Sequence, residues 1–406
     1  MTSPNIRFSA YSDKWEKETV GDVSKVTSGG TPNRANPAYW GGSIPWVTTS
    51  LIDFNKIVSA DEFITDEGLK GSSAKLFPKG TLLIALYGQG VTRGKVALLD
   101  IDATTNQACA AMMFDKNKVY QDFAFFQLMS KYEGIRNLAN DGGQKNLSGG
   151  LIKSLELTLP SIKEQRQIAD FLSSVDKKIS LLKEKHALLK QYKKGVMQKL
   201  FKQEIRFKDD NGNDFPDRQE LRFEQVFERV TRKNKEDNQN VLTISAQRGL
   251  INQEKYFNKS VSAKNVTGYY LLEKGDFAYN KSYSKGYPMG AIKRLNNYDK
   301  GVVSTLYICF KSHGEQHDEF WEQYFEAGNL NREINKIAQE GARNHGLLNV
   351  SVTEFFHDVK VVAPCAEEQQ KIADFLRVLD IKLDAVNQQI ELTQTFKKGL
   401  LQQMFV

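Results

Sequence analysis

The sequence contains nearly the same nine residues twice, as EQRQIADFL at residues 164–172 and as EQQKIADFL at residues 368–376. Sliding the sequence against itself by 204 residues aligns residues 160–201 with residues 364–405 without a gap, and 16 of those 42 positions are identical. Chance matching at ordinary residue frequencies gives only about two or three identities. The chain therefore carries an internal duplication with a period of a whole domain.

Both repeated stretches place apolar residues at helical spacing. The apolar positions advance by three and four residues, which makes one stripe on a helix, and more than four heptads without an internal proline favour a coiled-coil seam. Pro160 and Pro364 precede the stretches, where a helix can begin. The predicted seam residues are Ile168, Leu172, Val175, Ile179, Leu182 and Leu189 in the first copy, and Ile372, Leu376, Leu379, Leu383, Val386 and Ile390 in the second. The stripe is expected to continue through Val196 and Leu200 in the first copy, and through Phe396, Leu400 and Met404 in the second.

The length of these helices indicates how they are covered. A helix from Glu164 to Leu200 spans roughly 55 Å at ~1.5 Å per residue, which is longer than a small domain is wide. Two such helices can cover their stripes by packing on each other, although each could instead pack on its own globular region. The second half begins directly after the first helix, so the order of elements is circular. This order favours an antiparallel coiled coil within a pseudo-twofold molecule.

The regions between the helices differ strongly from each other in sequence. Both contain short β-rich runs separated by glycine turns, such as residues 81–87 and 302–310, together with helical stretches. We therefore predict an α/β protein in which two mixed α/β domains are joined by two long helices. The predicted boundaries are 1–158 for the first domain, 159–204 for the first helix, 205–362 for the second domain and 363–406 for the second helix.

Composition limits the class of protein. With 40% hydrophobic and 26% charged residues, a chain of 406 residues resembles a globular protein and is long enough for two hydrophobic cores. No apolar run approaches the ~18 to 20 residues that span a bilayer, and the polar N-terminus has no signal-peptide core. We therefore expect a cytoplasmic protein without a membrane partner.

Cysteine spacing and net charge add two further expectations. Cys109, Cys309 and Cys365 lie far apart, without a second cysteine or a histidine at zinc-ligand spacing, so neither a disulfide framework nor a metal site is indicated. Lysine plus arginine number 56 against 49 for aspartate plus glutamate, a net charge of +7. An excess of positive charge is compatible with a polyanionic partner.

Two stretches approach catalytic motifs without completing them. Residues 36–40, NPAYW, resemble the loop with which adenine methyltransferases hold a flipped base, but the second proline is absent and only 35 residues precede it. Residues 88–95 resemble a phosphate-binding loop, but Gln89 stands where glycine is needed and Val96 where a hydroxyl would bind magnesium. We therefore predict no catalytic residues in this chain.

Taken together, the residues resemble the specificity subunit of type I restriction-modification systems. The likeness covers essentially the whole chain: two divergent halves, the paired EQ-x-x-IADFL helices, KKG at residues 193–195 and 397–399, and GGTP with YWGG-IPWV within residues 29–47. The resemblance implies two target recognition domains that each read half of a split DNA sequence, with the coiled coil setting the spacer. It also implies two modification subunits that use S-adenosylmethionine, and restriction subunits that use ATP and Mg²⁺. This chain would then hold no cofactor.

Loop chemistry indicates where DNA would be contacted. Arginine, lysine, asparagine and glutamine read base edges, whereas serine, threonine and glycine mostly hold phosphates. The predicted DNA-binding residues of the first half are Ser28, Gly29, Thr31, Asn33, Tyr87, Gln89, Thr92, Arg93, Gln144, Lys145 and Asn146. Those of the second half are Ser245, Gln247, Arg248, Asn280, Lys281, Ser282, Tyr283, Lys285, Arg343 and Asn344. The alternative is a coiled-coil adaptor that joins protein partners without direct DNA contact.

Overall fold

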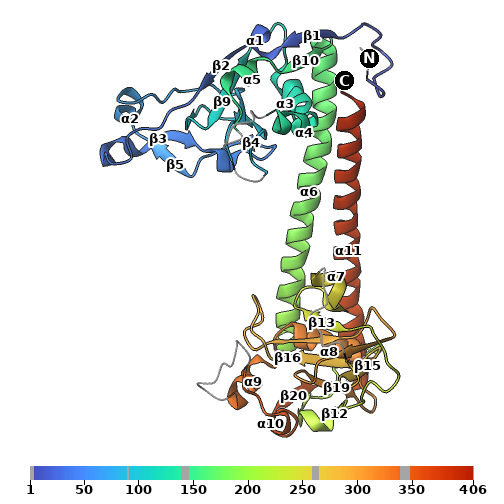
Figure 1. The fold of residues 1–406 in the computed structure, drawn as a ribbon. Coiled ribbons are helices and arrows are strands. Elements are labelled where there is room, and N and C mark those ends of the chain that lie inside the picture. The colour runs from blue at the N-terminus through green and yellow to red at the C-terminus, as the bar shows by residue number, and fades with distance from the viewer. Residues whose placement is uncertain (1–3, 89–90, 139–145, 258–264, 339–347, 406) are drawn as a thin grey trace. The chain divides into compact units, whose positions relative to one another are not determined.

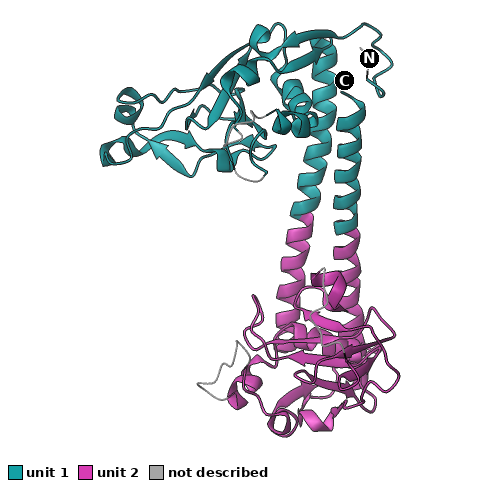
Figure 2. Ribbon diagram, in the orientation of Figure 1, with its two compact units in different colours: residues 1–184, 387–406 teal, residues 185–386 magenta. Residues whose placement is uncertain are grey.

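The computed structural model divides the chain into two compact units (Figures 1 and 2). Unit 1 comprises residues 1–184 and 387–406, and unit 2 comprises residues 185–386. Each unit combines a mixed α/β region with part of each long helix. The structure describes residues 4–88, 91–138, 146–257, 265–338 and 348–405.

The two long helices are α6, Ile162–Phe201, and α11, Ala366–Gln403. They run antiparallel, because each unit joins opposite ends of the pair. In unit 1 the first half of α6 shares a hydrophobic core with Leu400 in the last turn of α11 and with Met404 just after it. In unit 2 Met197 and Leu200, at the end of α6, share a core with the first half of α11. The predicted fold class is confirmed, and both helices also pack on the α/β regions.

The seam follows the predicted stripe until its last part. Leu182, Leu189 and Leu383 are half-buried. Phe396 was predicted to continue the stripe, and this is wrong, because its side chain is 55% exposed. Steps of three and four from Ile390 lead to Lys397 and then to Leu400, which was predicted for the stripe and is buried. The other predicted seam residues are buried: Ile168, Leu172, Val175, Ile179, Ile372, Leu376, Leu379, Val386 and Ile390.

The α/β region of unit 1 contains two main sheets. The five-stranded sheet has the order β2-β9-β6-β7-β4, with β2 Ser24–Ser28, β9 Cys109–Phe114, β6 Leu82–Ala85, β7 Val96–Leu99 and β4 Lys56–Ile57. The three-stranded sheet has the order β5-β3-β8, with β5 Glu62–Ile64, β3 Trp40–Val47 and β8 Thr104–Thr105. The helices of this region are α1 Val20–Val23, α2 Asp66–Lys70, α3 Gln121–Ser130, α4 Tyr132–Asn137 and α5 Gly149–Lys153.

The α/β region of unit 2 is built around a four-stranded sheet. Its order is β12-β19-β16-β17, with β12 Phe227–Arg229, β19 Ile308–Ser312, β16 Phe277–Asn280 and β17 Ala291–Arg294. Two further strand pairs are β13 Leu242–Ser245 with β14 Gly249–Asn252, and β15 Tyr270–Glu273 with β18 Lys300–Val303. The helices are α7 Gln253–Phe257, α8 Asp318–Glu326, α9 Asn331–Ile337 and α10 Val352–His357. The predicted β-rich run at 302–310 is two strands, because the chain turns at Ser304, whose carbonyl accepts from the Tyr307 amide.

The two α/β regions share one topology despite their different sequences. Strands β2, β9, β6 and β7 occur in the same spatial order as β12, β19, β16 and β17. Each region is also closed by an entry strand paired antiparallel with the strand before the long helix: β1 Glu16–Thr19 with β10 Glu156–Leu159, and β11 Gln219–Arg222 with β20 Lys360–Ala363. The duplication therefore includes the α/β regions as well as the helices.

The structure explains why the letters EQ occur twice. Glu164 and Glu368 are buried at the starts of the long helices, and each accepts hydrogen bonds from an arginine of its entry segment, Arg7 and Arg206. The amides of the following glutamines are buried too, and each donates at 2.9 Å to the carbonyl of the preceding proline, Pro160 or Pro364. Buried polar groups are stable only when they are hydrogen-bonded in this way.

Candidate nucleic-acid interface

In unit 1, two of the predicted DNA-binding loops begin at the same edge of the five-stranded sheet. Strands β2 and β6 lie on either side of β9 and are both antiparallel to it. Ser28 at the end of β2 is opposite Ala110, and Ala85 at the end of β6 is opposite Cys109. Adjacent residues of β9 therefore face the ends of both strands. The loops that follow Ser28 and Ala85 leave the sheet side by side.

The residues that follow the third predicted loop lie at the same edge of the sheet. The Leu147 amide donates to the Leu86 carbonyl at 3.0 Å, which brings the half-buried Asn146 close to Tyr87. Gln144 and Lys145 lie outside the described residues. Three segments that are far apart in the sequence thus meet at one end of the sheet.

The first loop presents some of its predicted residues and encloses others. Ser28 and Asn33 are exposed. Thr31 is half-buried, and its hydroxyl donates to the side chain of Gln107. Gly29 is buried, and its amide donates to the Cys109 carbonyl at 3.4 Å. The outward chemistry of this loop therefore comes from side chains rather than from the Gly29 amide.

The second loop is hydrogen-bonded to helix α4. Arg93 is half-buried and donates to the Arg136 carbonyl at 3.2 Å, while the Tyr132 hydroxyl donates to the Val91 carbonyl. Thr92 is half-buried. Tyr87 is exposed, and Gln89 lies outside the described residues.

The four-stranded sheet of unit 2 has an equivalent edge. Strands β12 and β16 lie on either side of β19, and Tyr279 near the end of β16 is opposite Ile308. The Lys281 carbonyl accepts from the Leu348 amide at 3.0 Å, as the Leu86 carbonyl accepts from Leu147 in unit 1. Arg343 and Asn344, which precede Leu348, lie outside the described residues.

The loop after β16 carries polar and aromatic side chains. The Asn280 side chain accepts from the Ser282 amide at 3.1 Å, which forms a turn directly after β16. Tyr283 is 61% exposed and Lys285 is exposed, whereas Ser282 is half-buried. Lys281 is half-buried, and burial lowers the pKa of its ammonium group. This loop therefore offers hydrogen-bonding groups, positive charge and an aromatic ring.

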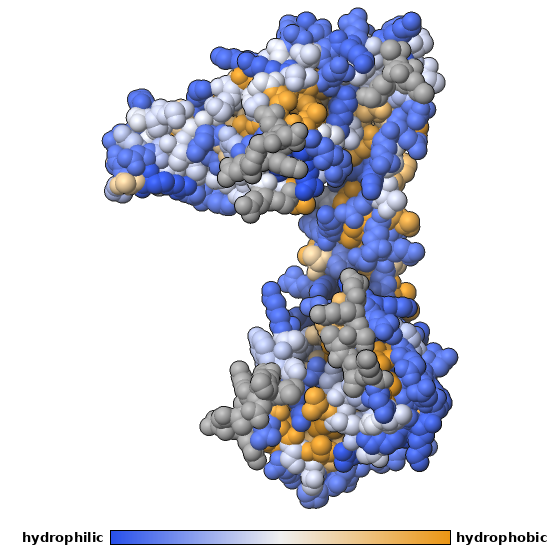
Figure 3. All heavy atoms as spheres, viewed as in Figure 1, coloured by the Kyte–Doolittle hydropathy of each residue, from blue (hydrophilic) through white to orange (hydrophobic). Residues whose placement is uncertain are grey.

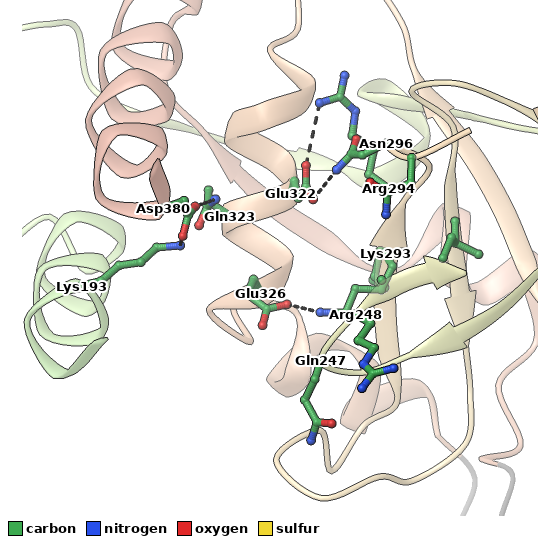
Figure 4. Close-up of a pocket in the computed structure, with 14 residues that line it drawn as sticks. Lys193, Gln247, Arg248, Lys293, Arg294, Asn296, Glu322, Gln323, Glu326 and Asp380 are labelled. Atoms are coloured by element: carbon green, nitrogen blue, oxygen red, sulfur yellow. Dashed lines mark hydrogen bonds and ion pairs between the residues drawn. The ribbon is translucent and has the colours of Figure 1, made fainter. Parts of the chain in front are cut away.

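The turn at residues 245–248 lies beside β17. Ser245 is buried, and its hydroxyl accepts from the Arg248 amide at 3.2 Å. The exposed side chains of Gln247 and Arg248 line a pocket of about 290 Å³ that also contains the Lys293–Glu326 ion pair (Figure 4). Among the described residues, no hydrogen bond joins this turn to the loop after β16, so the structure does not group the two as it groups the loops of unit 1.

The structure also reveals residues that sequence reasoning missed. Lys75 donates to the Thr27 hydroxyl at 2.7 Å and to the Ser28 carbonyl at 3.4 Å, so it supports the first loop. Nothing in its local sequence distinguishes it. Trp40 and Trp46 donate to carbonyls of the same loop. Their motif was visible in the sequence, but its contacts were not.

The described part of the chain offers no candidate metal site and no candidate membrane-spanning helix. Within the described ranges, no group of three or more histidine, cysteine, aspartate or glutamate side chains has the geometry of a metal site, and no helix is long and apolar enough to cross a membrane. Cys109 and Cys309 are buried, and burial raises the pKa of each thiol to about 12. These thiols are therefore uncharged near neutral pH.

Comparison with known proteins relates this geometry to a family. A model described as a type I restriction modification DNA specificity domain matches residues 12–191. The specificity subunit of the type I restriction enzyme MjaIX of Methanocaldococcus jannaschii is 29% identical over 182 residues, 44% of this chain and 41% of that protein. The EcoR124I/EcoR124II specificity subunit of Escherichia coli is 27% identical over 165 residues, 40% of this chain and 41% of that protein. Each match thus spans about two fifths of the relative's length.

Two solved structures share the fold over nearly the whole chain. The S subunit of a type I restriction-modification system from M. genitalium has a TM-score of 0.56 and 18% identity, covering 100% of this chain and 99% of that chain. A second, from work on complex assembly and conformational transition of the type I R-M system, has a TM-score of 0.56 and 14% identity, covering 95% and 96%. Together with the sequence matches, they confirm the resemblance to type I specificity subunits.

Proposed function

We propose that this chain, a relative of type I specificity subunits, is the DNA-recognition subunit of a restriction-modification complex and has no catalytic role itself. One observation carries the proposal: the DNA specificity domain matched at residues 12–191 covers the first α/β region, and the second region repeats its strand order. Repetition of one architecture supports assigning the same kind of task to both regions.

The proposed target is bipartite. The clustered loops of unit 1 and the loop after β16 in unit 2 occupy the same edge of equivalent sheets but differ in sequence. Unlike side chains recognise unlike base edges, so each region would read its own half-site. The long helices between the two regions would then set the number of unread base pairs between the half-sites.

Exposed apolar residues on the long helices favour the assignment of two protein partners to this chain. Leu188 and Tyr192 on α6 are more than half exposed, and so are Leu392 and Phe396, the residues at the duplicated positions of α11. Figure 3 shows apolar side chains exposed among polar ones along these helices. Two exposed apolar residues four positions apart share one face of a helix, and such a patch at the same positions in both copies favours a contact surface. We assign these two pairs to two modification subunits.

The remaining chemistry is assigned to partner subunits. Methylation would use S-adenosylmethionine bound by the modification subunits, and cleavage would use ATP and Mg²⁺ bound by restriction subunits. This chain would supply sequence recognition and a scaffold, without a cofactor of its own. The second of the two similar structures comes from work on complex assembly of the type I R-M system, which is compatible with a scaffold role for this chain.

A domain exchange tests the proposal. Residues 1–155 are replaced by those of another specificity subunit, and the chimera is produced with the modification subunits in cells. Sequencing of methylated sites should show a new sequence in one half of the target, with the other half and the spacer unchanged. A change in both halves would contradict the assignment of one half-site to each region.

A binding experiment separates DNA recognition from a purely adaptor role. The complex with modification subunits is titrated with target and non-target duplexes at several salt concentrations. Recognition predicts tighter binding to the target and a steep loss of affinity for both duplexes as salt rises, because phosphate contacts release counterions. Equal affinity for all duplexes would favour the adaptor.

A further inference from the structure

Two tryptophans of β3 hold the loop at residues 28–36. Trp46 is buried, and its Nε1 donates to the Gly30 carbonyl at 3.0 Å. Trp40 Nε1 donates to the Asn33 carbonyl at 3.2 Å. The two rings pack edge to face with centroids 5.1 Å apart, so the two indole N–H donors are held next to each other. The loop is therefore attached to the three-stranded sheet at two points, three residues apart.

The two glycines let this loop lie against its support. A Cβ on Gly29 would overlap the Thr105 carbonyl, and one on Gly30 would overlap the backbone of Ser73. The Gly30 amide donates to the Thr105 carbonyl at 2.8 Å. Any larger residue at these positions would push the loop outward, which accounts for the GG of the GGTP motif.

Arg34 covers the tryptophans from the solvent side. Its guanidinium lies 3.9 Å from the ring centroid of Trp40 and 4.7 Å from that of Trp46, and it is hydrogen-bonded to the Glu62 carboxylate. That hydrogen bond lowers the pKa of Glu62. Stacked arginine and a charged partner together fix the planes of both rings. The loop, the two indoles and Arg34 form a preassembled structure.

We infer that Trp46 and Trp40 are positioning residues for recognition of the first half-site. They direct the Gly30 and Asn33 carbonyls inward, and so they set the outward placement of Ser28 and Asn33. The Asn33 side-chain oxygen accepts from the Ala35 amide at 3.0 Å, which leaves its amide nitrogen as the outward donor. The inference rests on the proposed function, because it assumes that this loop contacts DNA.

Trp46→Phe tests the inference against a matched control, Trp15→Phe. Phenylalanine keeps an aromatic ring but leaves the Gly30 carbonyl without its indole donor. Trp15 is also a buried tryptophan of unit 1, 3% exposed like Trp46, but its Nε1 has no hydrogen-bond partner among the described residues. Both substitutions remove an indole, and only Trp46→Phe removes a hydrogen bond to the loop.

The measurement uses the complex with its modification subunits. Methylation rates are compared on the target and on duplexes with one base pair changed in either half-site. Trp46→Phe should reduce discrimination in the first half-site roughly 2- to 10-fold, the effect of one hydrogen bond, and leave the second half-site unaffected. Trp15→Phe should leave both unaffected. The half-exposed Trp40→Phe should weaken the same half-site and is the alternative if Trp46→Phe does not fold.

Three outcomes overturn the inference. The first is unchanged discrimination in both Trp46→Phe and Trp40→Phe. The second is an equal loss of discrimination in Trp15→Phe. The third is a fall in methylation by the same factor on all duplexes. Failure of the proposed function looks different, because the wild-type complex would then show no two-part target at all. A two-part target with no effect of the loop variants would reject only the positioning role.

Discussion

Lys193 of α6 forms an ion pair with Asp380 of α11 at 2.5 Å within unit 2. The duplicated residues form the same pair with the helices exchanged, because Lys397 of α11 meets Asp176 of α6 at 2.6 Å within unit 1. Both lysine side chains are largely buried, with 13% and 15% exposed. An antiparallel pair of duplicated helices brings the same two residues together twice, which explains the identity of both residue types in the repeat.

Removing one of these carboxylates should destabilise its unit. Asp380 also accepts from Gln323 of α8 at 2.9 Å, so it links both long helices to the α/β region (Figure 4). We expect Asp380→Asn to lower the free energy of unfolding by about 1–2 kcal/mol, because a largely buried ammonium loses its charged partner. Urea unfolding measures this. Asp384→Asn, an exposed residue of the same helix, should change it by less than about 0.5 kcal/mol; equal losses would contradict the role of Asp380.

Glu368 should make unit 2 sensitive to acid. Burial raises its pKa, but hydrogen bonds from Arg206 and Arg218, both at 2.7 Å to its carboxylate, outweigh burial, and the pKa is lowered. The unfolded state therefore binds the proton more tightly. The stability from this group is complete above the unfolded pKa of about 4.3 and is lost as pH falls below it. Unfolding experiments between pH 7 and 3 should show a shallower acid loss in Glu368→Gln.

The same substitution should be costly at neutral pH. Arg218 has only 2% of its side chain exposed. Without the Glu368 carboxylate, its buried guanidinium is left without an oppositely charged partner among the described residues. We expect Glu368→Gln to cost about 3 kcal/mol of unfolding free energy at pH 7. Glu164→Gln is the matched variant from the first copy, where Arg7 supplies the only arginine bonds to the carboxylate among the described residues. A cost for Glu368→Gln no larger than that of Glu164→Gln would argue against this account.

The exposed pairs on the long helices should each bind one modification subunit. Leu188→Asp with Tyr192→Asp should reduce the number of bound modification subunits from two to one, since charge cannot replace apolar contact. Adding Leu392→Asp and Phe396→Asp should remove the second. Native mass spectrometry of the purified complex counts the subunits. Gln191→Asp, an exposed change on the same helix, should keep both, and full assembly of the four-residue variant would exclude these pairs as the docking surface.

The length of the long helices should set the spacer. Insertion of one heptad into each helix preserves the seam and adds about 10 Å at ~1.5 Å per residue. We expect the spacer of the methylated target to grow by about three base pairs, because each occupies about 3.4 Å of duplex. Sequencing of methylated sites reads the spacer directly. Leu182→Lys with Val386→Lys should instead broaden it, and an unchanged spacer in both variants would separate coil length from target spacing.

Local patterns made the helices predictable from sequence. A helix is closed by hydrogen bonds four residues apart, so the apolar steps from Ile168 to Ile179 and the proline ahead of each stretch were sufficient to locate α6 and α11. The pairing of the helices followed from their duplication and length. Phe396 shows the limit of this reasoning, because an apolar residue one position away from the seam points outward.

The amphipathic character of the helices was determined by the sequence alone, since it depends on residues close together in the chain. Their duplication was also determined by the sequence, because it follows from direct comparison of two segments 204 residues apart. Only the tertiary structure decided that the divergent α/β regions share one strand order, that Asn146 lies beside Tyr87, and that Trp46 holds Gly30. These contacts join segments far apart in the sequence. Their partners are selected by packing and by backbone hydrogen bonding across sheets, which no local pattern encodes.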